Sequence, residues 1–221
     1  MISVLLPSRD RDWQMVDAAD SLLYMADSFD DVEILIAADP DDEGTIDTAR
    51  GCDFRLWIAP ERYGYANLSA YWNHLAMMAS GDWLLLWNDD ARMLTSGWDQ
   101  IIKSQPPAVL WAYTRGDDAG NYFPVWPASW TRLLGRICPI PGPHVDTYIQ
   151  AVGKHLDRIR RIPVELDHTR PDFTGTVPAD DTYAEGRMLL GRYGMVPGWD
   201  TLDLPHQAAE DAARIRDAGL L

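Results

Sequence analysis

The stretch GDWLLLWNDDARM, residues 81–93, contains the feature that decides the fold. Its apolar segment WLLLW has the length and composition of a buried strand. An amide and two carboxylates, Asn88, Asp89 and Asp90, follow directly. Adjacent like charges repel, so these residues require a cation, a basic partner or open solvent. The stretch therefore predicts a core strand whose carboxyl end is strongly polar.

Strand-like and helix-like segments alternate on the N-terminal side of this stretch. Strands are expected at residues 2–7, 32–39, 54–59 and 83–87. Helical periodicity runs over residues 12–29 and 65–79, and a helix-like link joins the second and third strands. This order is typical of an α/β fold with a mostly parallel sheet flanked by helices.

Polar side chains follow three of the expected strands. The three groups are Ser8, Arg9 and Asp10, then Asp39, Asp41 and Asp42, then Asn88, Asp89 and Asp90. Parallel strands bring their carboxyl ends to one edge of the sheet, where ligands of such folds bind. The sequence therefore predicts one ligand site at this edge.

The sequence changes character after residue 103. Residues 104–143 are rich in proline and aromatic residues, which predicts irregular strands and loops. The expected elements that follow are a helix at 145–159, a strand at 161–166, a loop at 169–182, and helices at 180–193 and 205–218. A chain of 221 residues is long enough to bury the core of one domain.

Composition narrows the classes of function. The formal net charge of −15 disfavours a general binder of phosphate backbones, which normally presents a basic surface. No apolar run reaches the length of a membrane span, and Met1 leads directly into a strand-like segment. Cys52 and Cys138 show no metal or disulfide spacing. We therefore expect a cytoplasmic protein without a transmembrane segment.

The polar end of the fourth strand has the chemistry of a divalent-metal site. Mg²⁺ and Mn²⁺ favour carboxylate oxygens and complete their shells with water or phosphate oxygens. Alternate residues at a strand end point the same way, so Asn88 and Asp90 are expected to face one ligand while Asp89 points elsewhere. The alternative is a solvated turn in which Asp89 or Asp90 caps the next segment.

The ordered set ISVLLPSRDR, VEILIAADPDDEGT and GYANLSAYWNHLAMMASGDWLLLWNDDARM resembles the nucleotide-binding half of a GT-A glycosyltransferase of the large family-two type. The resemblance is best over residues 2–103. It implies one Rossmann-like GT-A domain over residues 1–221. Residues 1–103 would bind a nucleoside diphosphate sugar, with UDP favoured, and residues 104–221 an acceptor. It also implies inverting transfer to an acceptor hydroxyl with Mn²⁺ or Mg²⁺.

The resemblance also implies roles for particular residues. Those implicated in binding the nucleotide sugar are Pro7, Ser8, Arg9, Asp39, Asn73, Asn88, Asp89 and Asp90. The Asp-X-Asp metal motif of the family falls on the last three. Its first acid is Asn88 here, and the paired acids after the second strand read Ala38-Asp39. A single direct carboxylate, Asp90, is therefore expected to hold the metal.

Two further site residues follow from the resemblance. The family expects an acid at the start of a helix in the second half, acting as the base that deprotonates the acceptor, and Asp146 matches it. An N-cap is the structural alternative for Asp146, and His144 is the rival base. His168 resembles the histidine that completes the metal shell. A surface histidine in a polar loop is its alternative.

Aromatic and basic residues suggest further contacts. Trp126 and Trp130 are expected to stack on an acceptor ring, with core packing as the alternative. Arg62 and Tyr63 are expected to border the nucleoside unless they lie in a solvated loop.

Other functions stay open at this stage. The acceptor could be a glycan, a protein, a lipid-linked sugar or a hydroxymethyl-type base in DNA. The DNA acceptor would need a basic strip made of Arg132, Arg136, Arg158, Arg160 and Arg161. A nucleotidyltransferase is disfavoured because PSRDRDW lacks the glycine-rich phosphate loop. A non-catalytic module that binds nucleotide sugars is the remaining alternative.

Overall fold

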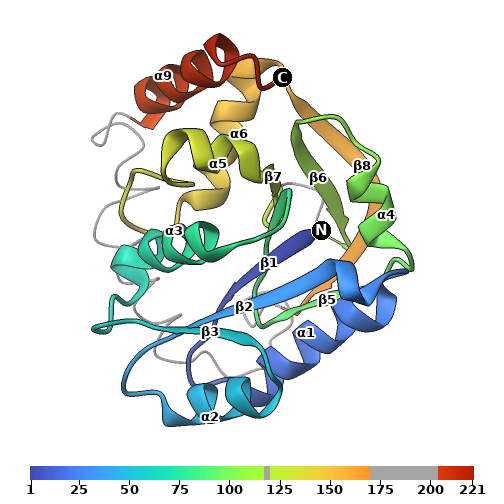
Figure 1. The fold of residues 1–221 in the computed structure, drawn as a ribbon, viewed down its shortest axis with the longest axis vertical. Helices are drawn as coiled ribbons and strands as arrows, with labels where there is room; N and C mark the ends of the chain where they lie inside the picture. Colours follow the sequence, from blue (N-terminus) through green and yellow to red (C-terminus); the bar gives the residue numbers. More distant parts are fainter. Residues whose placement is uncertain (117–119, 170–203) are drawn as a thin grey trace.

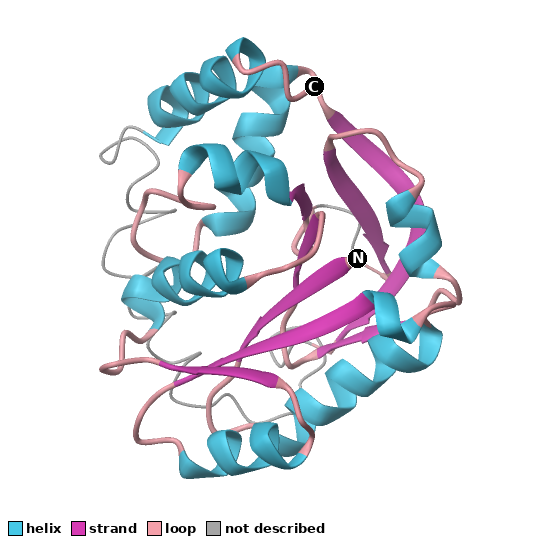
Figure 2. Cartoon of the chain, viewed as in Figure 1, coloured by secondary structure: helices cyan, strands magenta, loops and turns pink. Residues whose placement is uncertain are grey.

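The computed structural model describes residues 1–116, 120–169 and 204–221 and shows an eight-stranded sheet with helices on both faces (Figures 1 and 2). The strands are β1 (Ile2–Pro7), β2 (Val32–Ala38), β3 (Arg55–Ile58), β4 (Trp83–Leu86), β5 (Ala91–Met93), β6 (Val109–Thr114), β7 (Val125–Pro127) and β8 (Ile159–His168). Their spatial order is β3-β2-β1-β4-β7-β6-β8-β5. One continuous sheet therefore takes strands from both sides of residue 103.

The helices cover the two faces of the sheet. They are α1 (Asp12–Met25), α2 (Glu43–Gly51), α3 (Leu68–Met78), α4 (Trp98–Lys103), α5 (Ala128–Leu134), α6 (Val145–Leu156) and α9 (Leu204–Asp217), with 3₁₀ turns η1 (Phe29–Asp31) and η2 (Tyr65–Asn67). Helices α3, α5, α6 and α9 pack on one face, and α1, α2 and α4 on the other (Figure 1). Residues 2–6 of β1 are buried on both faces of the strand for this reason.

The sheet is parallel in its first half and mixed in its second. Strands β3, β2, β1 and β4 are parallel neighbours, as the sequence predicts. Strand β7 then runs antiparallel to both β4 and β6, and β5 runs antiparallel to β8. The expectation of a mostly parallel sheet therefore holds for the N-terminal strands and is wrong for the other edge.

Several boundaries differ from the sequence-based expectation. The segment 104–143 forms two strands and the helix α5 rather than only irregular structure, and β5 and α4 were not expected. The helix at 145–159 ends earlier, because Asp157 adopts a left-handed conformation with φ 54° that closes α6. The expected helix at 180–193, and the loop at 169–182 beyond Thr169, lie outside the described residues.

Helix α6 illustrates how the sequence positions the site. Val145, Ile149, Val152 and Leu156 recur on one face of the helix and are all buried. That face packs on the sheet and on α9, with Gly153 allowing close approach to Val109 and Ile159. The first turn of α6 is thereby fixed at the edge of the sheet where the polar strand ends meet.

Candidate functional site

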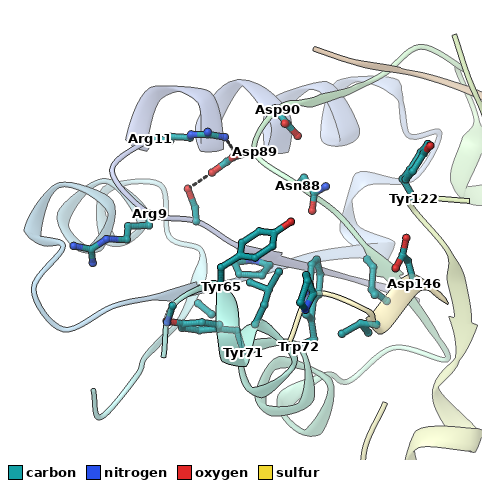
Figure 3. Close-up of a pocket in the computed structure, with 18 of the residues that line it drawn as sticks. Arg9, Arg11, Tyr65, Tyr71, Trp72, Asn88, Asp89, Asp90, Tyr122 and Asp146 are labelled. Carbon is teal, nitrogen blue, oxygen red and sulfur yellow. Dashed lines mark hydrogen bonds and ion pairs between the residues drawn. The ribbon is translucent and has the colours of Figure 1, made fainter. Parts of the chain in front are cut away.

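A pocket of about 410 Å³ opens at the carboxyl ends of β1, β2 and β4, where the sequence predicts a ligand site (Figure 3). Its lining combines the polar strand ends with an aromatic wall from α3 and with the first turn of α6. The lining residues are Pro7, Ser8, Arg9, Arg11, Ala37, Asp39, Arg62, Gly64, Tyr65, Leu68, Tyr71, Trp72, Leu86, Asn88, Asp89, Asp90, Tyr122, Pro143, His144, Val145, Asp146, Thr147 and His168.

Asp39 is buried at the end of β2 and held from two sides. Arg9 Nη1 donates a hydrogen bond to Asp39 Oδ2 at 3.0 Å, and the Tyr71 hydroxyl donates to Oδ1. Burial and this carboxylate raise the pKa of Tyr71 well above its ordinary value. The Tyr71 hydroxyl also accepts the backbone N–H groups of Tyr63 and Gly64 at 3.0 and 3.2 Å. Asp39 is therefore a rigidly oriented carboxylate in the pocket wall.

The two other acids after β2 have structural roles. Asp41 forms a two-pronged pair with Arg9 at 2.7 and 3.1 Å, and the hydrogen bond from Arg9 lowers the pKa of Asp41. Asp42 caps α2 by accepting the N–H of Thr45 at 3.1 Å, and it accepts the N–H of Asp10 at 2.9 Å. Neither acid lines the pocket.

Asp89 is the anchor between the β1–α1 loop and the end of β4. Ser8 Oγ donates to one carboxylate oxygen at 2.7 Å, and Arg11 Nη1 donates to the other at 2.9 Å (Figure 3). Burial raises the pKa of Asp89 to about 6, although the Arg11 charge opposes that shift. Asp89 points away from Asp90, as the alternation predicts, and both of its oxygens already accept hydrogen bonds from the chain.

Asp90 and His168 come together although 78 positions separate them in the sequence. Strand β5 pairs antiparallel with β8 so that Ala91 faces His168, and Thr169 N–H donates to the Asp90 carbonyl at 2.8 Å. This register places His168 Nε2 3.2 Å from Asp90 Oδ1. Phe123 packs edge-on against the imidazole with 4.8 Å between ring centroids and limits how it can turn. The predicted pair of metal ligands is therefore adjacent in the structure.

The donor set of this pair fits a divalent cation. An octahedral ion with ligands at about 2.1 Å needs neighbouring ligand atoms about 3 Å apart, which matches the 3.2 Å between Asp90 Oδ1 and His168 Nε2. Within residues 1–116, 120–169 and 204–221, no three His, Cys, Asp or Glu side chains converge on a common metal position. An ion held here would thus take its other ligands from water or from a bound diphosphate.

Asp146 enters the pocket from the first turn of α6 (Figure 3). Its Oδ1 accepts the Thr147 N–H at 2.6 Å and the Thr147 hydroxyl at 3.1 Å, which orients the carboxylate. The N-cap of α6 is His144 rather than Asp146, and the His144 side chain makes no capping hydrogen bond. His144 also lines the pocket, so both candidate bases lie at the site.

The structure contradicts three of the proposed ligand contacts. Asn73 lies outside the pocket lining, and its amide is bound to the backbone of Ile137 and Cys138. Trp126 and Trp130 are fully buried, with their rings edge-to-face at 5.0 Å between centroids. Their indole N–H groups donate to Thr131 Oγ1 and the Leu220 carbonyl, both at 2.8 Å. These two tryptophans pack the core and are not available to stack on an acceptor.

Sequence reasoning missed five residues of the pocket wall: Arg11, Tyr65, Tyr71, Trp72 and Tyr122. Arg11 was detectable, because it lies two positions after Arg9 in the same polar loop. The tyrosines and Trp72 carried no such signal, since aromatic residues at helical spacing usually indicate core packing. Tyr65 directs its hydroxyl toward Asn88 in Figure 3. Within the described residues, the Asn88 side chain has no hydrogen-bond partner, so its amide is available to a ligand.

The arginines considered as a nucleic-acid strip lie away from this pocket. Arg158, Arg160 and Arg161 precede or begin β8, and His168 ends it; eight residues of extended strand span about 26 Å. Arg161 stacks over Trp111 at 4.7 Å, and Arg136 pairs with the buried Asp211 at 2.9 Å. None of these arginines lines the pocket, so they provide no support for a DNA acceptor.

Comparison with known proteins identifies the fold. No family model matches the sequence, and no curated protein sequence matches it. No helix in the described parts of the chain is long and apolar enough to cross a membrane.

Solved structures nevertheless match the fold over most of the chain. A mannosyltransferase, PcManGT from Pyrobaculum calidifontis in complex with GDP-Man and Mn²⁺, is 17% identical with a TM-score of 0.62, covering 99% of this chain and 74% of that one. TarS 1–349 from S. aureus in complex with UDP is 12% identical with a TM-score of 0.62, covering 100% of this chain and 83% of that one. A longer TarS chain is 12% identical with a TM-score of 0.58; the match covers 78% of this chain and only 37% of that one.

A third protein agrees with these. Glucosyl-3-phosphoglycerate synthase from Mycobacterium tuberculosis, in complex with Mn²⁺, UDP and phosphoglyceric acid, is 16% identical with a TM-score of 0.59. That match covers 89% of this chain and 80% of the synthase chain. The α/β architecture expected from the sequence is confirmed, and the chain has the GT-A fold of these glycosyltransferases.

Proposed function

We propose that this protein is a glycosyltransferase that moves a sugar from a nucleoside diphosphate sugar to an acceptor hydroxyl. The observation that carries the proposal is the meeting of three groups in one pocket: the oriented acid Asp39, the Asp90–His168 pair and Asp146. Similar folds have been solved with UDP or GDP-Man and with Mn²⁺. UDP is the favoured nucleotide and Mn²⁺ or Mg²⁺ the favoured ion.

The proposed reaction is a direct displacement at the anomeric carbon. The acceptor oxygen forms a bond to that carbon while the bond from carbon to the diphosphate oxygen breaks, and the electron pair leaves with the diphosphate. The acceptor proton passes to the Asp146 carboxylate, which Thr147 holds in place. One displacement of this kind inverts the anomeric centre. A divalent ion held by Asp90 and His168 would neutralise charge on the departing diphosphate.

Donor binding gives the direct test of this proposal. Thermal unfolding is measured with UDP-, GDP-, ADP- and dTDP-sugars, each with and without Mn²⁺. A ligand that binds only the folded state stabilises it by about 2.7 kcal/mol at a hundred times its dissociation constant. We expect a Mn²⁺-dependent increase with one nucleotide. The absence of any increase at saturating concentrations would leave the chain with the fold but without the donor. Binding without turnover would favour a non-catalytic module.

The Asp90→Ala substitution is expected to abolish the Mn²⁺-dependent part of donor binding, because it removes the carboxylate of the proposed metal pair. Isothermal titration of the donor with and without Mn²⁺ measures this loss. The matched control is Asp82→Ala, since Asp82 is exposed and precedes the same strand β4, at the end far from the pocket. Full Mn²⁺-dependent binding by the Asp90→Ala variant would remove Asp90 from the site.

The Asn88→Asp substitution should have the opposite effect on metal dependence. It restores the first acid of the Asp-X-Asp pattern beside Asp90 and adds a carboxylate to the pocket. We expect the Mn²⁺ concentration for half-maximal donor binding to fall several-fold, as measured by titrating Mn²⁺ at fixed donor. An unchanged or higher requirement for Mn²⁺ would show that this side chain does not face the ion.

A further inference from the structure

Asn73 forms a three-point link between α3 and the segment that leads to α6. Its Nδ2 donates to the Cys138 carbonyl at 2.7 Å. Its Oδ1 accepts the backbone N–H groups of Ile137 and Cys138 at 2.9 and 3.0 Å. One amide side chain therefore holds three backbone groups, as a neighbouring strand would. Such a link fixes the position of the backbone on which it acts.

The segment held by Asn73 continues directly into the acceptor side of the pocket. Residues 143–147, which include His144 and Asp146, all line the pocket. A second link to α3 follows along the segment, because the Ser69 N–H donates to the Gly142 carbonyl at 3.2 Å. The buried side chains of the segment belong to the same core cluster as α3; they are Ile137, Cys138, Ile140 and Val145. The segment is thus fastened to α3 before it delivers Asp146.

The other side of α3 faces the donor. Tyr71 and Trp72 of this helix line the pocket, and the Tyr71 hydroxyl donates to Asp39. The same hydroxyl accepts the N–H groups of Tyr63 and Gly64 in the neighbouring loop. Helix α3 therefore contacts the donor wall through Tyr71 and the acceptor segment through Asn73, only two positions apart. A displacement of one side relative to the other requires one of these links to break.

We propose that Asn73 is a positioning residue that sets the placement of Asp146 relative to the bound donor. It acts through the backbone of Ile137 and Cys138 and does not touch the substrate. The inference rests on the proposed function, in which Asp146 is the base. A misplacement of about 1 Å at a reacting group costs about 10²-fold in rate, so loss of the link should lower turnover rather than donor affinity.

The test compares Asn73→Ala, Asn73→Asp and Met77→Ala. Asn73→Ala removes all three hydrogen bonds, whereas Asn73→Asp keeps both acceptors for the Ile137 and Cys138 N–H groups. Met77 is one turn further along α3 and exposed, so Met77→Ala is the matched control. UDP-glucose with MnCl₂ is the probe. Donor affinity is measured by calorimetry, and the turnover number by release of UDP with water as acceptor.

We expect Asn73→Ala to lower the turnover number about 10²-fold with donor affinity changed less than twofold. Asn73→Asp should recover most of that loss, and Met77→Ala should match the unsubstituted protein. Equal loss of donor affinity and turnover in Asn73→Ala would show a general structural role and overturn the inference. Unchanged turnover would also overturn it.

Hydrogen exchange separates this inference from the proposed function. In Asn73→Ala, the amides of Ile137 and Cys138, and of Tyr148 whose N–H donates to the His144 carbonyl, should exchange faster. Those of Tyr63 and Gly64 should not change. Protection unchanged at Tyr148 would overturn the inference even if the protein transfers sugar. If the unsubstituted protein neither binds a sugar nucleotide nor releases UDP, the proposed function fails, and exchange at Tyr148 still decides the link.

Discussion

Asp146→Asn is expected to lower the rate of sugar transfer by about 10²–10⁴-fold, the usual contribution of a general base. The substitution preserves shape and keeps an oxygen that can accept the Thr147 N–H and hydroxyl. It removes only the capacity to take a proton. Donor binding should therefore be unchanged, and the loss should appear in the turnover number. Steady-state kinetics with the donor found in the thermal panel measures both quantities.

The matched control for this variant lies at the other end of the same helix. Asp157 is exposed, closes α6 in a left-handed conformation that asparagine also adopts, and is absent from the pocket lining. Asp157→Asn should transfer sugar at the normal rate. If Asp146→Asn also does, the base lies elsewhere and His144→Gln becomes the decisive variant, because His144 lines the same pocket.

Asp211→Ala is expected to lower the free energy of unfolding by about 3–5 kcal/mol, the cost of breaking a buried ion pair from one side. Asp211 is 2% exposed in α9. It accepts hydrogen bonds from Arg136 at 2.9 Å, from Arg214 at 3.1 Å and from the Tyr148 hydroxyl. Without the carboxylate, Arg136 and Tyr148 lose their common acceptor in a largely buried environment. For a chain of this size, the melting temperature should fall by about 6–20 °C.

Two further variants interpret that loss. Glu210→Ala changes the neighbouring acid, whose contact with His206 is exposed and lies within one helix, so stability should change by less than about 0.5 kcal/mol. Tyr148→Phe removes one hydrogen bond to the carboxylate and should cost about 1.5–3 kcal/mol. Urea denaturation measures all three. A cost below about 1 kcal/mol for Asp211→Ala would show that this network does not hold α9 against α6.

Much of the site was predictable because its residues follow strands in sequence. Ser8, Asp39 and Asp90 each come directly after an apolar run, and parallel pairing of β1, β2 and β4 brings those ends together. Asp146 and His168 required the family resemblance, since nothing in their local sequence distinguishes them from surface residues. Both nevertheless lie in the pocket.

The wrong assignments share a physical cause. Asn73 has the residue type of a polar ligand contact, and Trp126 and Trp130 have the type that stacks on sugars. Residue type does not state what a side chain meets in space. Asn73 meets the backbone of a segment more than sixty positions away, and the two tryptophans meet each other in the core. Such partners depend on the packing of α3 and α5.

The sequence by itself determined the alternation of strands and helices in the first half and the polar edge at which those strands end. Burial patterns and strand-end positions are local, so each can be inferred from a short window of residues. Only the tertiary structure decided which polar groups form pairs. The antiparallel register of β5 and β8 brings His168 to Asp90, and the fold of the β1–α1 loop turns Arg11 onto Asp89. Register is set by packing across the whole sheet, and a shift of one residue would have turned His168 to the opposite face.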